Sequence, residues 1–265
     1  MIFRQIPIML ALSLLFAVVL LPGCSSERPK GKTPAETLLK EAQELAADSR
    51  YLLATERLNQ LKSEHPYSFY VTAADLLRAE ILYKQQNYVE AAAMFGLCRD
   101  LHPRHEKLSY VVWMMAESYS KQLPTTFDRD LSAAPEAIKY YTEVIERYPD
   151  SEYVTKAKNQ IEKVTSMLRN RDKYVADFYF KTGVFDAARY RYLDILKTWK
   201  EPSLADHSMV RVVEASLTLK DYQDCYKYSA LYAEIIGDSS KDRIRTLGEK
   251  CEKLYKKVLA EKIQE

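Results

Sequence analysis

The chain has 265 residues, with 39 lysines and arginines against 37 aspartates and glutamates, for a formal net charge of +2. This balance gives no electrostatic basis for binding nucleic acid, so we expect no nucleic-acid partner. Glycine occurs only six times, whereas tyrosine occurs 20 times. Few turn-forming residues and many amphipathic aromatic side chains favour a helical protein with contact surfaces.

The first part of the chain has the pattern of a targeting signal. A basic start and an apolar run, too short for a membrane-spanning helix, end in Leu-Pro-Gly-Cys24. This pattern resembles the bacterial lipoprotein signal, in which the cysteine is acylated and becomes the mature N-terminus. We therefore predict a signal peptide over residues 1–23, lipidation at Cys24 and a flexible tether over residues 24–33. Ser25 favours the outer membrane, and an ordinary cleaved signal with an incidental cysteine is the alternative.

From Pro34 onward, apolar residues recur at spacings of three and four, which predicts helices throughout. One pattern occurs three times: an alanine, a large apolar residue four positions later, and a proline eight positions after that. The copies are Ala54, Leu58 and Pro66; Ala91, Phe95 and Pro103; and Ala137, Tyr141 and Pro149. The alanine lets two helices approach closely, the residue four later lies on the same face, and the proline ends the helix.

This pattern matches the second-helix half of the tetratricopeptide repeat, and degenerate copies begin at Gly183 and Asp221. We predict an all-α fold, a tetratricopeptide-repeat α-solenoid of about five helix pairs plus a C-terminal helix. Stacked helix pairs leave a long surface for protein partners. In the fourth copy Arg191 takes the position that Leu58 holds in the first. Its guanidinium must then reach solvent or meet an acid, of this chain or of another protein.

Two intervals between repeats are longer than the norm of about 34 residues. One contains a polar insertion at residues 123–134. The other, residues 150–183, has no proline or glycine before its last position and predicts one long helix, with two helices meeting near residues 170–172 as the alternative. We divide the repeats into an N-terminal half, residues 34–149, and a C-terminal half, residues 150–240.

Residues 241–265 predict a further amphipathic helix, interpreted as a cap on the last repeat. A helix that docks a partner is the alternative. Cys225 and Cys251 belong to no metal or redox motif, and buried free thiols are the favoured interpretation. A disulfide between these two cysteines, which an oxidising compartment would allow, is the alternative.

Motifs for chemistry are absent from the sequence. The four histidines, His65, His102, His105 and His207, form no metal-binding spacing, and no phosphate-binding or nucleophile motif occurs. We therefore expect no catalytic residue, no metal and no cofactor, and interpret the chain as a binding protein.

Three aromatic residues, Tyr67, Phe69 and Tyr70, follow the turn at Pro66. The favoured interpretation places them in a hydrophobic staple and the core. The alternative is that they line a groove for the aromatic-rich end of a peptide.

The lipoprotein signal, the five repeats, the insertion and residues 174–191 (YVADFYFKTGVFDAARYR) together resemble the BamD family of lipoproteins. These belong to the machinery that assembles outer-membrane β-barrels. The resemblance runs from Cys24 to about Leu219, and residues 174–191 are its most specific part. It implies an outer-membrane protein assembly factor, lipid-anchored in the outer membrane and facing the periplasm.

The resemblance also implies partners and site residues. The N-terminal half would bind unfolded outer-membrane proteins through their C-terminal strand, with His65, Tyr67 and Tyr70 in the substrate-side groove. The C-terminal half would dock the periplasmic domains of the barrel-forming subunit through Arg191. His65 stands where the family has an aromatic residue. Another tetratricopeptide lipoprotein, such as a secretin or type IV pilus pilotin or a cell-envelope coordinator, is the alternative, and an enzyme is the third possibility.

Overall fold

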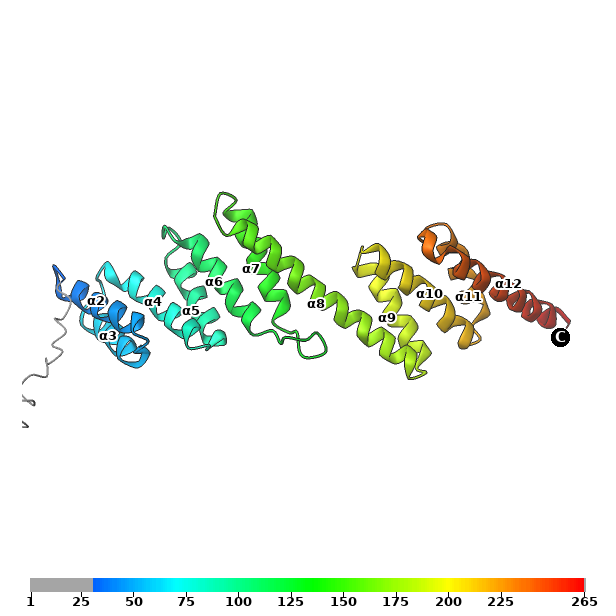
Figure 1. Ribbon diagram of the computed structural model, residues 1–265, viewed down its shortest axis with the longest axis horizontal. Helices are drawn as coiled ribbons and strands as arrows, with labels where there is room; N and C mark the ends of the chain where they lie inside the picture. Colours follow the sequence, from blue (N-terminus) through cyan, green and yellow to red (C-terminus); the bar gives the residue numbers. More distant parts are fainter. Residues whose placement is uncertain (1–30, 265) are drawn as a thin grey trace, which may run out of the picture. The chain divides into compact units, whose positions relative to one another are not determined.

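The computed structural model describes residues 31–264, and over that range the chain forms helices and no strand. The helices are α2 (Pro34–Ala47), α3 (Tyr51–Glu64), α4 (Tyr70–Lys84), α5 (Tyr88–Leu101), α6 (Leu108–Lys121), α7 (Ala134–Arg147), α8 (Val154–Lys181), α9 (Phe185–Thr198), α10 (Pro202–Thr218), α11 (Tyr222–Ala233) and α12 (Lys241–Gln264), with a 3-10 turn at Asp238–Ser240 (Figure 1). Five successive pairs, α2/α3 to α10/α11, precede α12, which confirms the predicted fold. The predicted signal peptide and Cys24 lie outside the described residues.

The chain divides into two compact units, Met1–Arg78 and Ala79–Glu265, with the boundary inside α4. The division predicted between residues 149 and 150 concerns function rather than contacts, and it stays a prediction. No helix within residues 31–264 is both long and apolar enough for a membrane crossing.

Four of the five helix pairs share one turn. Two residues after the end of each first helix stands a residue with positive φ. The backbone N–H of the residue that follows it donates to the carbonyl five residues earlier, as in a Schellman motif. The positive-φ residues are Ser49, Gln86, Gly183 and Lys220, and the N–H donors are Arg50, Asn87, Val184 and Asp221. In each of these turns a small buried residue follows five positions after the positive-φ residue. These small residues are Ala54, Ala91, Ala188 and Cys225.

Three second helices end as the prolines predict. The last residue before each proline, His65, His102 or Tyr148, leaves the helical region, with φ between −126° and −132° and ψ between 54° and 60°. The ring of a following proline disfavours the helical conformation at these positions. Each stop therefore fixes where the next pair of helices begins.

The repeated alanines and their apolar partners form the core. Ala54, Ala91 and Ala137 are fully buried, as are Leu58, Phe95 and Tyr141, which confirms the pattern. The fourth copy corrects our prediction, because Ala188 and Tyr192 hold the buried positions and Arg191 is exposed. The turn at Gly183 sets the register one residue later than the one we assumed, and one residue rotates a side chain by about 100° around a helix.

Residues 154–181 form one helix, α8, of 28 residues, so the prediction of a single long helix is confirmed. The insertion after α6 is less polar than we inferred. Its Leu131 is buried in a cluster with Ala134 and Val164, and Phe127 packs partly against this cluster. The insertion therefore packs against the middle of α8, around Val164, Met167 and Leu168.

The C-terminal helix α12 packs on α11, with Ile244 and Cys251 buried on its apolar side. Cys225 and Cys251 form a disulfide with Cα atoms 5.5 Å apart, so the favoured interpretation of free thiols was wrong. Burial of both cysteines was the correct part of that interpretation. The disulfide joins α12 to the last repeat.

Candidate functional site

The first unit has a pocket of about 410 Å³ where the start of α2 lies beside the turn after α3. Its lining residues are Thr33, Pro34, Ala35, Glu64, His65, Pro66, Tyr67, Ser68 and Tyr70. The turn is held by hydrogen bonds from the Ser68 N–H to the His65 carbonyl (3.0 Å) and from the Tyr70 N–H to Ser68 Oγ (3.3 Å). The three residues predicted for the substrate-side groove, His65, Tyr67 and Tyr70, thus line one pocket.

Two of the three aromatic residues of this turn face solvent, and the third, Tyr70, is half-buried. Tyr67 is 101% exposed and Phe69 is 90% exposed, so the favoured interpretation that they belong to the core was wrong. The ring of Phe69 meets that of Tyr70 edge to face, with centroids 6.1 Å apart. His65 Nε2 is buried and has no hydrogen-bond partner among the described residues. Exposed aromatic surface of this kind is typical of a protein-binding site.

A second pocket, of about 260 Å³, lies between α8 and α9 in the other unit. Its lining residues are Arg171, Asp172, Val175, Arg191, Asp194 and Ile195. Asp172 accepts hydrogen bonds from Arg171 Nε (3.1 Å) and Nη2 (2.8 Å), and from Trp199 Nε1 (3.0 Å). Arg191 has no ion pair or hydrogen bond from its side chain within residues 31–264. Its guanidinium is therefore available to an acid from outside the chain.

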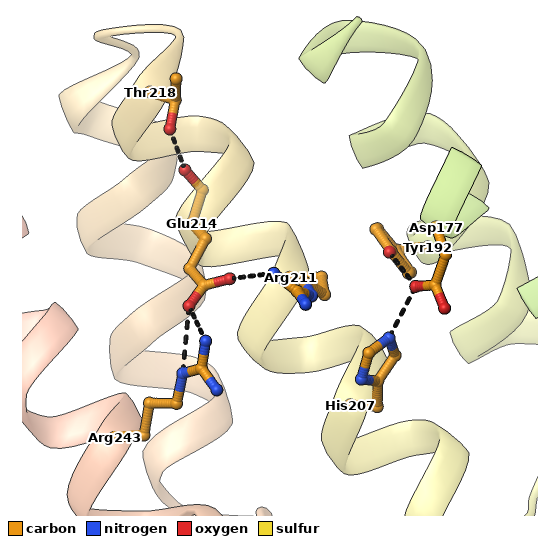
Figure 2. Close-up of polar contacts among 7 residues, drawn as sticks. All are labelled: Asp177, Tyr192, His207, Arg211, Glu214, Thr218 and Arg243. Atoms are coloured by element: carbon orange, nitrogen blue, oxygen red, sulfur yellow. Dashed lines mark hydrogen bonds and ion pairs between the residues drawn. The ribbon is translucent and has the colours of Figure 1, made fainter. Parts of the chain in front are cut away.

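The same two helices are joined to α10 through the carboxylate of Asp177 (Figure 2). Tyr192 Oη donates to Asp177 Oδ1 at 2.5 Å, His207 Nε2 lies 2.8 Å from the same oxygen, and Lys173 Nζ lies 2.5 Å from Oδ2. Burial alone would raise the pKa of the Asp177 carboxyl, but these hydrogen bonds outweigh it and lower that pKa to about 2. Burial and the hydrogen bond to Asp177 raise the pKa of Tyr192, which keeps the phenol a donor.

A similar arrangement occurs one repeat earlier. Glu117 Oε1 of α6 accepts from Tyr141 Oη of α7 at 2.5 Å and from Gln160 Nε2 of α8 at 3.3 Å. Acidic residues of first helices thus bind both their own second helix and the next first helix. The sequence analysis did not predict these hydrogen bonds between an acid and its neighbouring helices. Two tyrosines at the same repeat position, each with an acid on the preceding helix, were a signal that could have indicated them.

In the last repeat the corresponding acidic residue is Glu214 of α10, which connects α10 to α12. Glu214 Oε1 accepts from Arg243 Nε of α12 at 3.0 Å, and Oε2 accepts from Arg211 Nη1 at 3.0 Å (Figure 2). In residues 31–264 no three histidine, cysteine or acidic side chains are grouped to hold a metal ion.

This fold defines the class: an all-α protein of the tetratricopeptide-repeat type. The sequence model of the outer-membrane lipoprotein family YfiO matches residues 32–229, and the chain belongs to that family. The match ends before α12 begins.

Relatives among characterised proteins are named outer membrane protein assembly factor BamD. That of Vibrio cholerae is 29% identical over 217 residues, covering 78% of this chain and 88% of its own length. That of Caulobacter vibrioides is 25% identical over 202 residues, covering 74% of this chain and 66% of its own length. Among solved structures, the TPR2AB-domain:pHSP90 complex of yeast Sti1 is 16% identical with a TM-score of 0.41, covering 84% of this chain and 100% of that chain.

Proposed function

We propose that this protein is an outer-membrane protein assembly factor: a non-catalytic lipoprotein scaffold that binds unfolded β-barrel proteins and docks the barrel-forming subunit. The family match over residues 32–229 and the assembly-factor names of the relatives support the proposal. The observation that carries it is a pair of separate surface sites. One pocket has exposed aromatic side chains, and the other has an arginine without a partner among the described residues.

The membrane anchor belongs to the proposal. Acylation of Cys24 would tether the repeats to the outer membrane through residues 24–33, facing the periplasm. The lipoprotein description of the family supports this assignment. Each methylene buried in the bilayer contributes about 0.8 kcal/mol, and a single acyl chain gives only reversible membrane binding. A stable anchor therefore needs more than one acyl chain.

The docking site is the pocket between α8 and α9. The Arg191 guanidinium can form two parallel hydrogen bonds with one carboxylate, which gives strength and a fixed orientation. Val175 and Ile195 supply apolar lining beside it. A carboxylate on the periplasmic domains of the barrel-forming subunit is the partner that this chemistry fits.

The substrate groove is the pocket of the first unit. Tyr67 and Tyr70 offer ring faces to an aromatic side chain, and such pairs contribute about 0.5–1.5 kcal/mol beyond the area they bury. The C-terminal strand of an unfolded outer-membrane protein is the ligand we assign to it. His65, where the family has an aromatic residue, would adjust the preference for the peptide end.

The docking assignment is tested with the full chain and the purified periplasmic domains of the barrel-forming subunit of the same organism. We expect Arg191→Glu to weaken binding about 100-fold, because a like charge then faces the partner's acid. Arg104→Glu is the matched control, since Arg104 is also exposed, and it should change binding by less than about twofold. Equal affinity of the wild type and Arg191→Glu would contradict the assignment.

The groove is tested with a synthetic peptide of the C-terminal strand of an outer-membrane protein. Tyr67→Ala and Tyr70→Ala should each weaken its binding about tenfold. Leu52→Ala, at a side chain 73% exposed on α3, is the control. Peptide binding that is the same in all three variants as in the wild type would remove the groove from the proposal.

A further inference from the structure

One face of α8 is covered along its first half and open along its second half. Helical spacing places Val164, Met167, Arg171, Tyr174 and Phe178 on this face, which we call the α8 face. The insertion covers its first half, where Val164 and Met167 pack in the cluster around Leu131. In the second half Tyr174 is 50% exposed and Phe178 is 52% exposed.

The cover ends at a defined contact. The ring of Phe127, from the insertion, meets that of Tyr174 with centroids 6.0 Å apart, in an edge-to-face arrangement. Phe178 lies one helical turn further along and is not covered by the insertion cluster. The insertion therefore contacts the first aromatic, Tyr174, through one ring only, and its cluster does not include the second, Phe178.

The open half of the α8 face is continuous with the pocket that holds Arg191. Arg171 belongs to the face and also lines the pocket, together with Val175 one turn further on. Arg171 and Trp199 both donate to Asp172, and neither Asp172 nor Asp194, the other acid that lines the pocket, forms an ion pair with Arg191 among the described residues. Two half-exposed aromatic rings beside an arginine without a partner in residues 31–264 are the residue types that dominate binding energy in protein interfaces.

We infer that Tyr174 and Phe178 extend the Arg191 site into one docking surface, occupied by a partner segment that carries an acidic side chain beside an apolar one. The acid pairs with Arg191 and the apolar side chain lies over the two rings. The occupant is the same partner that the proposed function assigns to Arg191, so this inference rests on the proposed function. Charge selects the partner, because Arg191 forms no ion pair with either acid that lines its pocket, Asp172 or Asp194, among the described residues.

The apolar contact fills the uncovered half of a face whose other half the insertion fills within the chain. The partner thus continues a packing surface that the fold begins. This continuity explains why the large aromatic side chains of Tyr174 and Phe178 remain half-exposed on α8.

The experiment measures binding of the full chain to the periplasmic domains of the barrel-forming subunit by calorimetry. Tyr174→Ala and Phe178→Ala should each weaken binding about tenfold, and the double variant about 100-fold. Leu231→Ala is the control, because Leu231 of α11 is 52% exposed and lies outside the face. Thermal unfolding of each variant is recorded alongside, and we expect melting temperatures close to that of the wild type.

The comparison with Arg191→Glu separates this inference from the proposed function. Loss of binding in Arg191→Glu with unchanged affinity in both aromatic variants and in the double variant would overturn the inference alone. Unchanged affinity in Arg191→Glu as well would overturn the docking function. A dimer of the purified chain that Phe178→Ala dissociates would also overturn the inference, because a second copy would then be the occupant.

Discussion

Replacing Asp177 by asparagine removes the charge that joins α8, α9 and α10. Tyr192 and His207 lie 2.5 Å and 2.8 Å from Oδ1, and Lys173 lies 2.5 Å from Oδ2. Hydrogen bonds to a charged group contribute about 1.5–3 kcal/mol each, and the asparagine oxygen can keep part of one of them. We therefore expect the free energy of unfolding to fall by about 2–4 kcal/mol at neutral pH.

The pH dependence of the free energy of unfolding gives a second value for the contribution of Asp177. The pKa of Asp177 is lowered from its ordinary value of 3.8 to about 2, because the hydrogen bonds outweigh the opposing effect of burial. At about 1.4 kcal/mol for each pKa unit, ionised Asp177 contributes about 2.5 kcal/mol. Since the pKa is lower in the folded state, this contribution is fully present above pH of about 4 and is lost as the pH falls toward 2.

The assay is urea unfolding followed by far-UV circular dichroism, at neutral pH and at intervals down to a pH of about 2. The wild type should lose about 1.8 kcal/mol more than Asp177→Asn between pH values of about 4 and 2, because Asp177 is still about half ionised in the folded state at a pH of about 2. Asp150→Asn, at an exposed turn residue, is the control and should match the wild type. Equal stability of Asp177→Asn and Asp150→Asn at neutral pH would refute the reasoning.

Three further changes test the packing, each by thermal or urea unfolding. Replacing Cys225 and Cys251 with serine removes a disulfide that closes a loop with a sequence separation of 26. The unfolded chain then regains the loop entropy, which should destabilise the last repeat by about 3.5 kcal/mol. Unchanged stability would show that the disulfide does not form or does not stabilise the fold. Ala137→Leu should destabilise by about 1–3 kcal/mol, because the alanine is fully buried, and a neutral result would mean that the helices do not pack closely there. Leu131→Ala should lose about 2–4 kcal/mol and expose Phe127 to quenchers, whereas a mobile insertion would show neither effect.

Helix content and repeat order were predictable because alanine spacing and the proline stops are local signals. Ala54, Ala91 and Ala137 each mark a point where two helices approach closely, and in these three repeats the pattern allows only one register. The register predicted for the fourth repeat was wrong because residues 187 and 188 are both alanines. Only the backbone of Gly183, with φ of 81°, decides which of them is buried.

The sites were predictable in part. The turn after Pro66 and the odd position of Arg191 drew attention to Tyr67, Tyr70 and Arg191, and the family resemblance supplied their roles. The structure adds the residues around them, which lie far apart in the sequence. The disulfide between α11 and α12 depends on how two helices are aligned, which the spacing of the cysteines does not determine.

Photocrosslinking in intact cells from position 191, with position 67 in parallel, tests the central claim most directly. We expect position 191 to capture the barrel-forming subunit and position 67 to capture unfolded outer-membrane proteins. Capture of a secretin at both positions, or of neither predicted partner, would contradict it.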